Sequence, residues 1–544
     1  LVFLRDGQPW AAPARGGRKP APLFIDQGQV GSLTWSPHGR RLAFVSSREE
    51  HSLIGIYDFA TKSIQWMSPG IDQDIDPVWS PDGKRVAFIR TASDPVVPFT
   101  SRRECTPWEI RVADAATGRG REIWRADKGV GSCFRLLFNS RHSLFWGAGD
   151  RLIFPWEVTG WLRLYSISAS GGTTGPERNS SQLLTPGESE VFGADLSAER
   201  TYLVYSSNEG DLDRRHIWDL PVAGGAPRQL TFGEGLEDMP VITAGGRIFA
   251  LRGEATRPLR PVEVKGTEMT DLAPQAIPPD FPADGLVVPQ LVTFEAADGM
   301  TVHAQLFVPK GRTRPGPAIL FFHGGPTNRQ MFAAWDPFET HSHLYESSQY
   351  LAHHGYEVLS VNYRGGAGYG LSFREPPGFG AGGASELNDI IGAAKYMIAR
   401  PEVDPKRLGV WGGSYGGRMT LLALARAPQY FAAGVSYAGI YDWLTMPQFD
   451  LNAAHPGNTA ATARAYDSGA LAHMEKWRAP VLLMSGDADL EVNFEQTTAL
   501  AARLRRKGIA VDVLVIPGEV HFLLRHSSWN TVFEAAKDYF DEHL

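Results

Sequence analysis

Cysteine is scarce in this sequence, because only Cys105 and Cys133 occur in 544 residues. Two cysteines cannot build the disulfide framework that holds small secreted domains together. Neither lies in a Cys-x-x-Cys or Cys/His cluster, so we expect no metal site, and we expect no cofactor. One disulfide between the two is compatible with an oxidising compartment, but two ordinary buried thiols are the interpretation that we favour.

Long apolar runs are absent as well. No stretch approaches the roughly 18 consecutive apolar residues of a transmembrane helix, so we expect no membrane span. No signal peptide is visible, but the chain begins with Leu1 and not with Met, and a removed segment could have carried one. The location is therefore open: periplasmic or secreted if a signal was removed, and otherwise cytoplasmic.

Positive charge is not in excess, since 53 Lys and Arg face 60 Asp and Glu, giving a net charge of -7. This balance provides no electrostatic case for nucleic-acid binding. A hydrophobic content of 43% and a charged content of 21% are typical of globular proteins and exclude a largely disordered chain. The length predicts about two to four domains.

The first half of the chain contains a repeat. Residues 33–44 (LTWSPHGRRLAF) recur as residues 77–88 (PVWSPDGKRVAF), with the tryptophan 44 positions later, and weaker copies occur at 144–154 and 194–205. Each copy reads as an apolar strand, a Ser-Pro-x-Gly turn and an alternating strand, which is a hairpin. Strand-only repeats of about 40–50 residues are typical of β-propellers. We predict a propeller over residues 1–275 with five to six blade-sized segments, either a small ring or an N-terminally incomplete one.

Three acidic residues near the predicted propeller loops, Glu157, Asp211 and Asp213, could line a channel. Loop carboxylates are mostly solvated, so we expect ordinary surface side chains here. Nothing else in this half indicates a reaction.

The second half, 283–544, has a different pattern. Six short runs are almost entirely apolar, as expected of strands covered on both faces of a parallel sheet. Helical patterns lie between them; Ser385 can cap one that stops at Pro401, and the last begins near Ser528. We predict an α/β-hydrolase-type, doubly wound, mostly parallel sheet. The predicted strands are 318–322, 357–362, 407–411, 432–437, 481–485 and 511–516.

The segment 412–417 (GGSYGG) follows one of these strands and carries a Gly-x-Ser-x-Gly pattern around Ser414. Such a serine sits on a sharp strand-to-helix turn, where small neighbours let the backbone fold tightly. The pattern alone also fits an ordinary glycine-rich turn. Whether Ser414 is a nucleophile therefore depends on whether an acid and a histidine lie in suitable positions.

Suitable partners follow later strand ends, where ligands gather in such sheets. Asp487 and Asp489 come after the strand 481–485, and His521 comes after 511–516. The order serine, acid, histidine is that of α/β-hydrolases. We predict Ser414 as nucleophile, His521 as its base and an aspartate that orients the imidazole. The other histidines after Ser414 are His455, His473, His526 and His543, of which His526 is the nearest rival.

A developing oxyanion needs two aimed hydrogen-bond donors. We expect one to be the backbone N–H of Tyr415, the residue after the nucleophile. The other should come from the glycine loop 323–326 (HGGP), with Gly325 as the donor. The His323 side chain is expected to pack or hydrogen-bond locally.

Together these stretches resemble the prolyl oligopeptidase family, which includes dipeptidyl peptidases and acylaminoacyl peptidases. The matching segments are 323–326, 362–365, 368–370, 412–417 and the acid and histidine segments, whose Asp489 and His521 lie 32 residues apart. With the propeller, the resemblance covers nearly the whole chain. It implies that Asp489 and not Asp487 is the acid, and that the propeller limits substrates to short peptides. It also suggests that Tyr441 and Trp443 line the specificity pocket, although both could equally be ordinary core.

Two features depart from the dipeptidyl peptidases, which anchor a free amino terminus with a paired-glutamate motif. The one Glu-Glu here, Glu49-Glu50, lies in an unlike turn, and Glu491 stands where those enzymes often carry asparagine. We therefore expect a serine peptidase for short peptides, acylaminoacyl-peptidase-like or oligopeptidase-like, with the propeller gating access. The alternatives are a dipeptidyl peptidase, or an esterase or amidase for small acyl substrates. The preferred residue before the scissile bond, exo- or endo-cleavage, and assembly into a homo-oligomer are left open.

Overall fold

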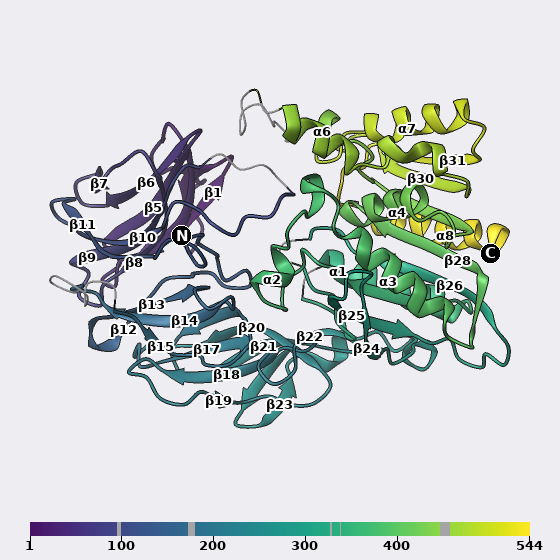
Figure 1. Cartoon of the computed structure of the whole chain (residues 1–544). Helices are drawn as coiled ribbons and strands as arrows, with labels where there is room; N and C mark the ends of the chain where they lie inside the picture. The colour runs from purple at the N-terminus through teal and green to yellow at the C-terminus, as the bar shows by residue number, and fades with distance from the viewer. Residues whose placement is uncertain (95–98, 172–179, 327–328, 338, 447–456, 458) are drawn as a thin grey trace.

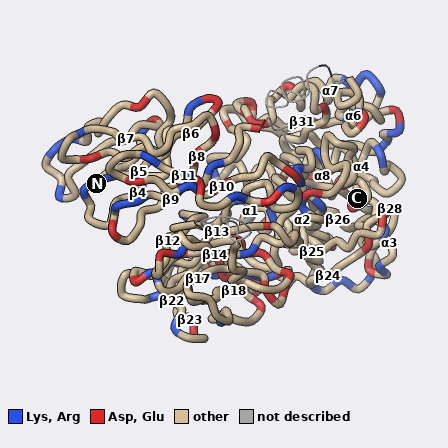
Figure 2. Tube along the Cα trace, turned by 60° about the vertical axis from the view of Figure 1, so that its left-hand side comes forward, with Lys and Arg blue, Asp and Glu red and all other residues tan. Residues whose placement is uncertain are grey.

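The protein consists of two halves with different architecture, and Figure 1 shows the N-terminal sheets on the left and the C-terminal sheet with its helices on the right. The computed structural model describes residues 1–544 except 95–98, 172–179, 327–328, 338, 447–456 and 458. Basic and acidic residues are interspersed over both halves (Figure 2). None of the helices in the described ranges has the length and apolar character that a membrane crossing requires.

The N-terminal half is built of antiparallel sheets in which each strand pairs with its neighbour in sequence, as in propeller blades. The described residues form a three-stranded sheet followed by five four-stranded units, the first two joined by one parallel contact between Ser52 and Gln73. The predicted propeller architecture is confirmed. The strands are β1 (Val2–Arg5), β2 (Gln8–Ala11), β3 (Ala21–Pro22), β4 (Gln29–Trp35), β5 (Arg41–Arg48), β6 (His51–Asp58), β7 (Ser63–Met67), β8 (Gln73–Trp79), β9 (Arg85–Thr91), β10 (Glu109–Asp114), β11 (Gly120–Arg125), β12 (Phe145–Gly147), β13 (Arg151–Trp156), β14 (Arg163–Ser168), β15 (Gln182–Leu183), β16 (Val191–Leu196), β17 (Tyr202–Ser207), β18 (His216–Pro221), β19 (Arg228–Gln229), β20 (Leu236–Ile242), β21 (Ile248–Glu254), β22 (Arg257–Lys265) and β23 (Glu268–Asp271).

The repeated Ser-Pro-x-Gly segments form matching turns. The N–H of Ser36 donates to Arg41 O at 2.9 Å between β4 and β5, and the N–H of Ser80 donates to Arg85 O at the same distance between β8 and β9. Gly39 and Gly83 adopt left-handed φ angles of 64° and 66°, which glycine tolerates without a Cβ clash. The sequence repeat therefore corresponds to a repeat of the first hairpin of each of these two four-stranded units.

The C-terminal half contains one eight-stranded sheet of order β24-β25-β27-β26-β28-β29-β30-β31. Pairing is parallel from β27 to β31, and β24 and β25 extend the sheet as an antiparallel edge. All six predicted strands are present, although β28 begins at residue 403 and not at 407. The strands are β24 (Gln290–Glu295), β25 (Thr301–Phe307), β26 (Gly316–Phe322), β27 (Glu357–Asn362), β28 (Val403–Gly413), β29 (Ala433–Tyr437), β30 (Val481–Gly486) and β31 (Val511–Ile516).

Helices cover both faces of this sheet. On one face α3, α4 and α7 pack against alternate strand residues such as Leu408 and Val410, and on the other α1 and α8 pack against residues such as Trp411. This arrangement explains why the strands read as nearly continuous apolar runs. The helices are α1 (Glu339–His353), α2 (Leu371–Arg374), α3 (Leu387–Ile398), α4 (Tyr415–Arg426), α6 (Thr459–Asp467), α7 (Glu495–Arg506) and α8 (His526–His543), with 3-10 turns η1 (Ala148–Asp150), η3 (Pro274–Ala276), η4 (Ala283–Gly285), η5 (Gly380–Gly382), η6 (Trp443–Thr445) and η7 (Leu471–Lys476).

Two smaller features of the sequence differ from the structure. Ser385 does not cap α3, because Glu386 occupies the N-cap position in a helical conformation and no side chain caps the first turn. The last helix starts at His526, two residues before the predicted position. The expected domain limits, 1–275 and 283–544, stay a prediction; β23 ends at Asp271 and β24 begins at Gln290.

The expectation of two free thiols is wrong, since Cys105 and Cys133 form a disulfide. Their Cα atoms lie 4.9 Å apart because the two loops run side by side. The N–H of Cys105 donates to Ser132 Oγ at 2.9 Å, and Trp108 Nε1 donates to Gly131 O at 3.1 Å. The spacing of two cysteines in the sequence does not predict that their loops lie next to each other.

The expectation of solvated acidic loops is wrong for Glu157 and Asp213, because the C-terminal half covers them. Glu157 is buried and accepts a hydrogen bond from Arg374 Nη2 at 2.6 Å. Asp213 accepts one from the Tyr369 hydroxyl at 2.6 Å, and its other oxygen lies 2.8 Å from His303 Nδ1. Asp211 instead pairs with the neighbouring Arg214 within the propeller. Glu157 and Asp213 therefore hold the two halves together.

Arg374 lies at the centre of this interface with its side chain 1% exposed. Besides Glu157, its guanidinium lies 3.8 Å from Glu190 Oε1 and 3.7 Å from Glu375 Oε1. Burial opposes the charge of Arg374, but the three carboxylates outweigh burial and raise the pKa of the guanidinium. Glu190 also accepts the backbone N–H groups of Gly368 and Gly370.

We expect the Arg374→Met substitution to destabilise the protein by about 3–5 kcal/mol, because it leaves buried carboxylates without their main cation. In scanning calorimetry the unfolding midpoint should fall by roughly 5–10 °C. Burial raises the pKa of Glu375 already in the native protein. Without Arg374 the folded-state pKa of Glu375 should rise further above its unfolded value, so the deficit should shrink as pH falls from 8 to 5.

The matched control is Arg506→Met, which removes the same charge from the exposed end of α7. It should leave the midpoint nearly unchanged. A similar small change in both variants would contradict the structural importance of Arg374.

Candidate active site

Ser414 lies between β28 and α4 with φ 58° and ψ -120°, a conformation that residues with a Cβ rarely adopt. The glycines around it allow the turn. A Cβ on Gly416 would lie 1.8 Å from Phe322 O, and one on Gly412 would lie 2.5 Å from the same oxygen. Neither position can hold a side chain, so the predicted serine elbow exists and depends on both glycines.

The three side chains predicted to act together are in contact. His521 Nε2 lies 2.8 Å from Ser414 Oγ, and His521 Nδ1 lies 2.7 Å from Asp489 Oδ2. Asp489 and His521 are both buried. Asp487 lies elsewhere and accepts the N–H of Gly518 at 2.7 Å. The three side chains form one hydrogen-bonded chain from Asp489 through His521 to Ser414. The catalytic roles of these residues stay a prediction.

Backbone contacts fix the acid and the imidazole. Asp489 Oδ1 accepts the N–H groups of Glu491 and Val492, each at 2.9 Å. The Tyr437 hydroxyl donates to His521 O at 2.8 Å. Burial and the nearby charge of Asp489 raise the pKa of Tyr437, which keeps this donor protonated. The loop that carries His521 is thus tied to the strand next to the serine.

The glycine loop after β26 lies against the serine. A Cβ on Gly324 would meet Ser414 Cβ at 3.2 Å, and Gly325 has a left-handed φ of 101°. Neither the N–H of Gly325 nor that of Tyr415 donates to another residue in the described part of the chain. Their role as an oxyanion hole stays a prediction. His323 packs locally as expected, with its ring stacked on Tyr363 and Nδ1 2.7 Å from Gly324 O.

A buried ion pair holds the residue after the serine. The Tyr415 hydroxyl donates to Glu386 Oε1 at 3.0 Å, and Arg418 Nη1 lies 3.2 Å from the same carboxylate. All three side chains are buried, and burial raises the pKa of Tyr415 so that it stays a donor. Sequence reasoning missed this pair, because Glu386 directly precedes α3, Arg418 lies in α4, and no spacing links them.

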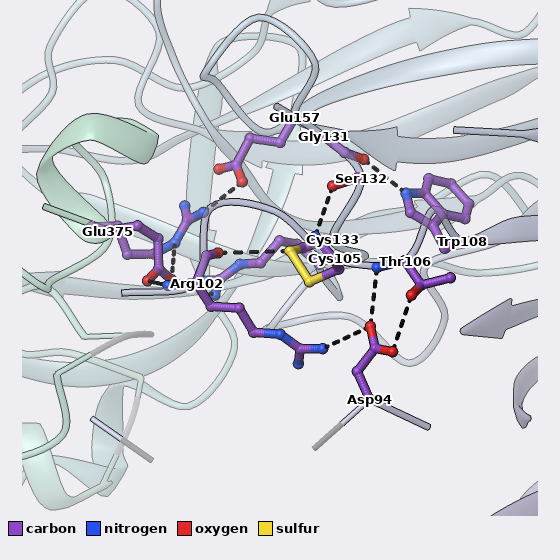
Figure 3. Close-up of a disulfide and its surroundings, with 12 residues drawn as sticks. Asp94, Arg102, Cys105, Thr106, Trp108, Gly131, Ser132, Cys133, Glu157 and Glu375 are labelled. Atoms are coloured by element: carbon purple, nitrogen blue, oxygen red, sulfur yellow. Dashed lines mark hydrogen bonds and ion pairs between the residues drawn. A yellow bond between two sulfur atoms is a disulfide. The ribbon is translucent and has the colours of Figure 1, made fainter. Parts of the chain in front are cut away.

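The propeller contributes Phe99 to the aromatic cluster around Tyr415. Its ring centroid lies 5.4 Å from that of Tyr415 and 5.2 Å from that of Trp443, and its carbonyl accepts the N–H of Ala381 at 3.1 Å. The same loop continues to Arg102, whose N–H donates to Glu375 Oε2 at 2.7 Å. Figure 3 shows the Cys105–Cys133 disulfide next to this contact. The disulfide thus anchors the propeller loop that approaches the serine elbow.

The other residues considered for the site, as far as the structure describes them, lie in the protein core, in an exposed turn or in helices. Trp443 and Tyr441 are both buried in the core of the C-terminal half, and their predicted role in a specificity pocket stays a prediction. Glu49 and Glu50 end up in an exposed turn between β5 and β6. Of the other histidines, His473 lies near Asp467, while His526 and His543 are the end residues of α8. His455 lies outside the described residues.

Comparison with known proteins finds similarity mainly in the C-terminal half. Residues 342–544 match the family model described as "Prolyl oligopeptidase family". A curated relative, the uncharacterised peptidase YuxL of Bacillus subtilis, is 29% identical over 47% of this chain and 39% of its own length. The acylamino-acid-releasing enzyme of Arabidopsis thaliana is 28% identical over 38% of this chain and 28% of its own length. The alignments therefore span well under half of the curated relatives.

A solved structure extends the likeness to the whole chain. A puromycin-hydrolysing peptidase of Mycobacterium tuberculosis superimposes with a TM-score of 0.81, covering 100% of this chain and 84% of that one at 22% identity. At this identity the likeness shows the fold, a propeller with an α/β-hydrolase half. The C-terminal part of the chain, residues 342–544, thus matches the prolyl oligopeptidase family, and it follows a propeller-type N-terminal half.

Proposed function

We propose that the protein is a serine peptidase that cleaves short peptides through an acyl-enzyme intermediate. The observation that carries the proposal is the hydrogen-bonded chain Asp489–His521–Ser414 at the end of the glycine elbow. A serine hydroxyl is a weak nucleophile until a neighbouring base takes its proton. The domain resemblance to peptidases supports peptides as the substrate class.

In this proposal His521 Nε2 takes the proton of Ser414 Oγ as the oxygen attacks the peptide carbonyl. The imidazolium, stabilised by Asp489, then gives the proton to the leaving amine, and water later hydrolyses the ester in the same way. The N–H groups of Tyr415 and Gly325 would receive the oxyanion in both steps. Each donor belongs to the protein backbone, so little reorganisation accompanies the reaction.

We further propose that residues 1–275 act as a propeller that restricts access to a catalytic domain of residues 283–544. The loop contact at Phe99 and the interface around Arg374 support a propeller that takes part in shaping the site. Relatives include acylamino-acid-releasing enzymes as well as dipeptidyl peptidases, so their names support a peptidase of either kind. The one Glu-Glu pair, Glu49-Glu50, lies in a turn unlike the dipeptidyl motif, which favours amino-terminally blocked peptides or oligopeptides over dipeptidyl substrates.

The test compares turnover of three substrate sets: amino-terminally acetylated short peptides, dipeptidyl substrates with a free amino terminus, and simple esters. We expect hydrolysis of the acetylated peptides with a higher kcat/KM than of the dipeptidyl substrates. Faster turnover of the dipeptidyl set would replace the acylaminoacyl-like assignment by a dipeptidyl one. Turnover of esters alone would remove the peptidase proposal and leave an esterase.

A further inference from the structure

A second carboxylate lies beside the reacting imidazole. Glu491 Oε2 is 4.0 Å from His521 Nε2, the nitrogen that also contacts Ser414 Oγ. In contrast to the buried Asp489, the side chain of Glu491 is 59% exposed. A substrate has to approach Ser414 from the solvent side, so the carboxylate lies where substrate groups pass.

The position of Glu491 is fixed by the site itself. Its backbone N–H donates to Asp489 Oδ1 at 2.9 Å, as does that of Val492. The backbone of Glu491 is therefore fixed relative to Asp489. The position of its carboxylate then depends on the side-chain torsions of Glu491. A group held this way can act on substrates with little extra ordering.

The surroundings suit an amphipathic cation. Leu490, the residue before Glu491, is 85% exposed, and the exposed ring of Phe522 lies 5.1 Å from the ring of His521. These apolar surfaces can contact an aliphatic stem while the carboxylate binds a charged end. In a productive complex the reacting atoms lie about 3 Å from Ser414 Oγ and His521 Nε2. A substrate cation one residue from the scissile bond would thus lie near Glu491, whose carboxylate is 4.0 Å from His521 Nε2.

We propose that Glu491 is a specificity-determining residue that binds a cationic group of the substrate next to the scissile bond. This inference rests on the peptidase function proposed above. Two sources share the chemistry: the α-ammonium of the residue that forms the acyl-enzyme, and a side-chain ammonium on the leaving residue. At a half-exposed site the attraction corresponds to about a three- to tenfold preference in kcat/KM.

The competing interpretation is a solvated glutamate that only adds negative charge near the imidazole. Such a charge affects the reaction in the same way for every substrate. Recognition instead changes the ratio between charged and uncharged substrates. The ratio is therefore the quantity to measure.

The experiment uses two matched substrate pairs at pH 7.0, where amino groups are largely charged. In one pair a free α-amino peptide is compared with its des-amino analogue, and in the other lysine after the scissile bond is compared with norleucine. Wild type is set beside Glu491→Gln and the control Glu495→Gln, which removes the same charge from an exposed position at the start of α7. kcat/KM is determined for each combination at low and high salt.

We expect wild type and Glu495→Gln to prefer the charged member of at least one pair by about threefold or more. The preference should fall towards unity in Glu491→Gln and weaken at high salt. The pair that responds identifies the source of the cation. Ratios in Glu491→Gln equal to those of wild type would overturn the inference while leaving the peptidase function intact. A wild-type protein that cleaves no peptide and reacts with no serine-directed probe would instead refute the underlying function.

Discussion

The Ser414→Ala variant is expected to lose peptidase activity by about 10⁴-fold or more in kcat/KM, and to lose all labelling by a fluorophosphonate. The probe reacts when Ser414 Oγ forms a bond to phosphorus and fluoride leaves, which requires His521 Nε2 at 2.8 Å to accept the proton. Alanine removes the oxygen and leaves the elbow unchanged. Some catalysis over water should remain, because the oxyanion donors are backbone groups.

Ser527→Ala is the matched control, since Ser527 is exposed in the first turn of α8 and takes no part in the site. It should label and turn over like wild type, and both variants should unfold near the wild-type temperature. Labelling that survives in Ser414→Ala, or a wild-type protein that does not label, would refute the nucleophile assignment.

The Asp489→Asn variant is expected to lower kcat by about 10³–10⁴-fold with little effect on stability. The reason lies in the hydrogen bonds to Oδ1, which accepts the N–H groups of Glu491 and Val492. An asparagine has to keep its oxygen there, so its NH₂ group faces His521 Nδ1. That nitrogen then becomes an acceptor, the proton moves to Nε2, and the imidazole can no longer take the proton of Ser414.

Asp487→Asn tests the same change two residues away, where the carboxylate accepts only the N–H of Gly518 among the described residues. An asparagine oxygen can accept that bond, so kcat should stay within a few-fold of wild type. Steady-state kinetics with one peptide substrate measure both variants. A larger loss in Asp487→Asn than in Asp489→Asn would reverse the assignment of the acid.

The parts of the fold that the sequence predicts are those determined by local pattern. Strands buried on both faces must be apolar throughout, so all six predicted runs of the C-terminal sheet are recognisable. Ser414, His521 and an acid at 487 or 489 could be predicted because parallel strands end at one edge of the sheet. The choice of Asp489 over Asp487 comes from the family resemblance. The Ser-Pro-x-Gly turns could be placed because the turn needs glycine at a left-handed position.

What the sequence does not predict depends on contacts between distant segments. Phe99 meets Trp443 across more than three hundred residues, and no periodicity connects them. Glu157 looks like any loop carboxylate until Arg374 covers it. The pairing of Cys105 with Cys133 likewise follows from two loops that tertiary structure brings together. In each case the local sequence fits a solvated loop equally well.

The loop around Phe99 and the ion pairs of Arg374 also bear on how such a protein can change over evolution. A propeller exchanged for that of a relative would have to supply a side chain that packs against Tyr415 and carboxylates that pair with Arg374. The two halves are therefore not interchangeable modules, and a chimaera should need matched changes on both sides of the interface. Divergence in this architecture is expected to proceed by paired substitutions across the junction more readily than by domain shuffling.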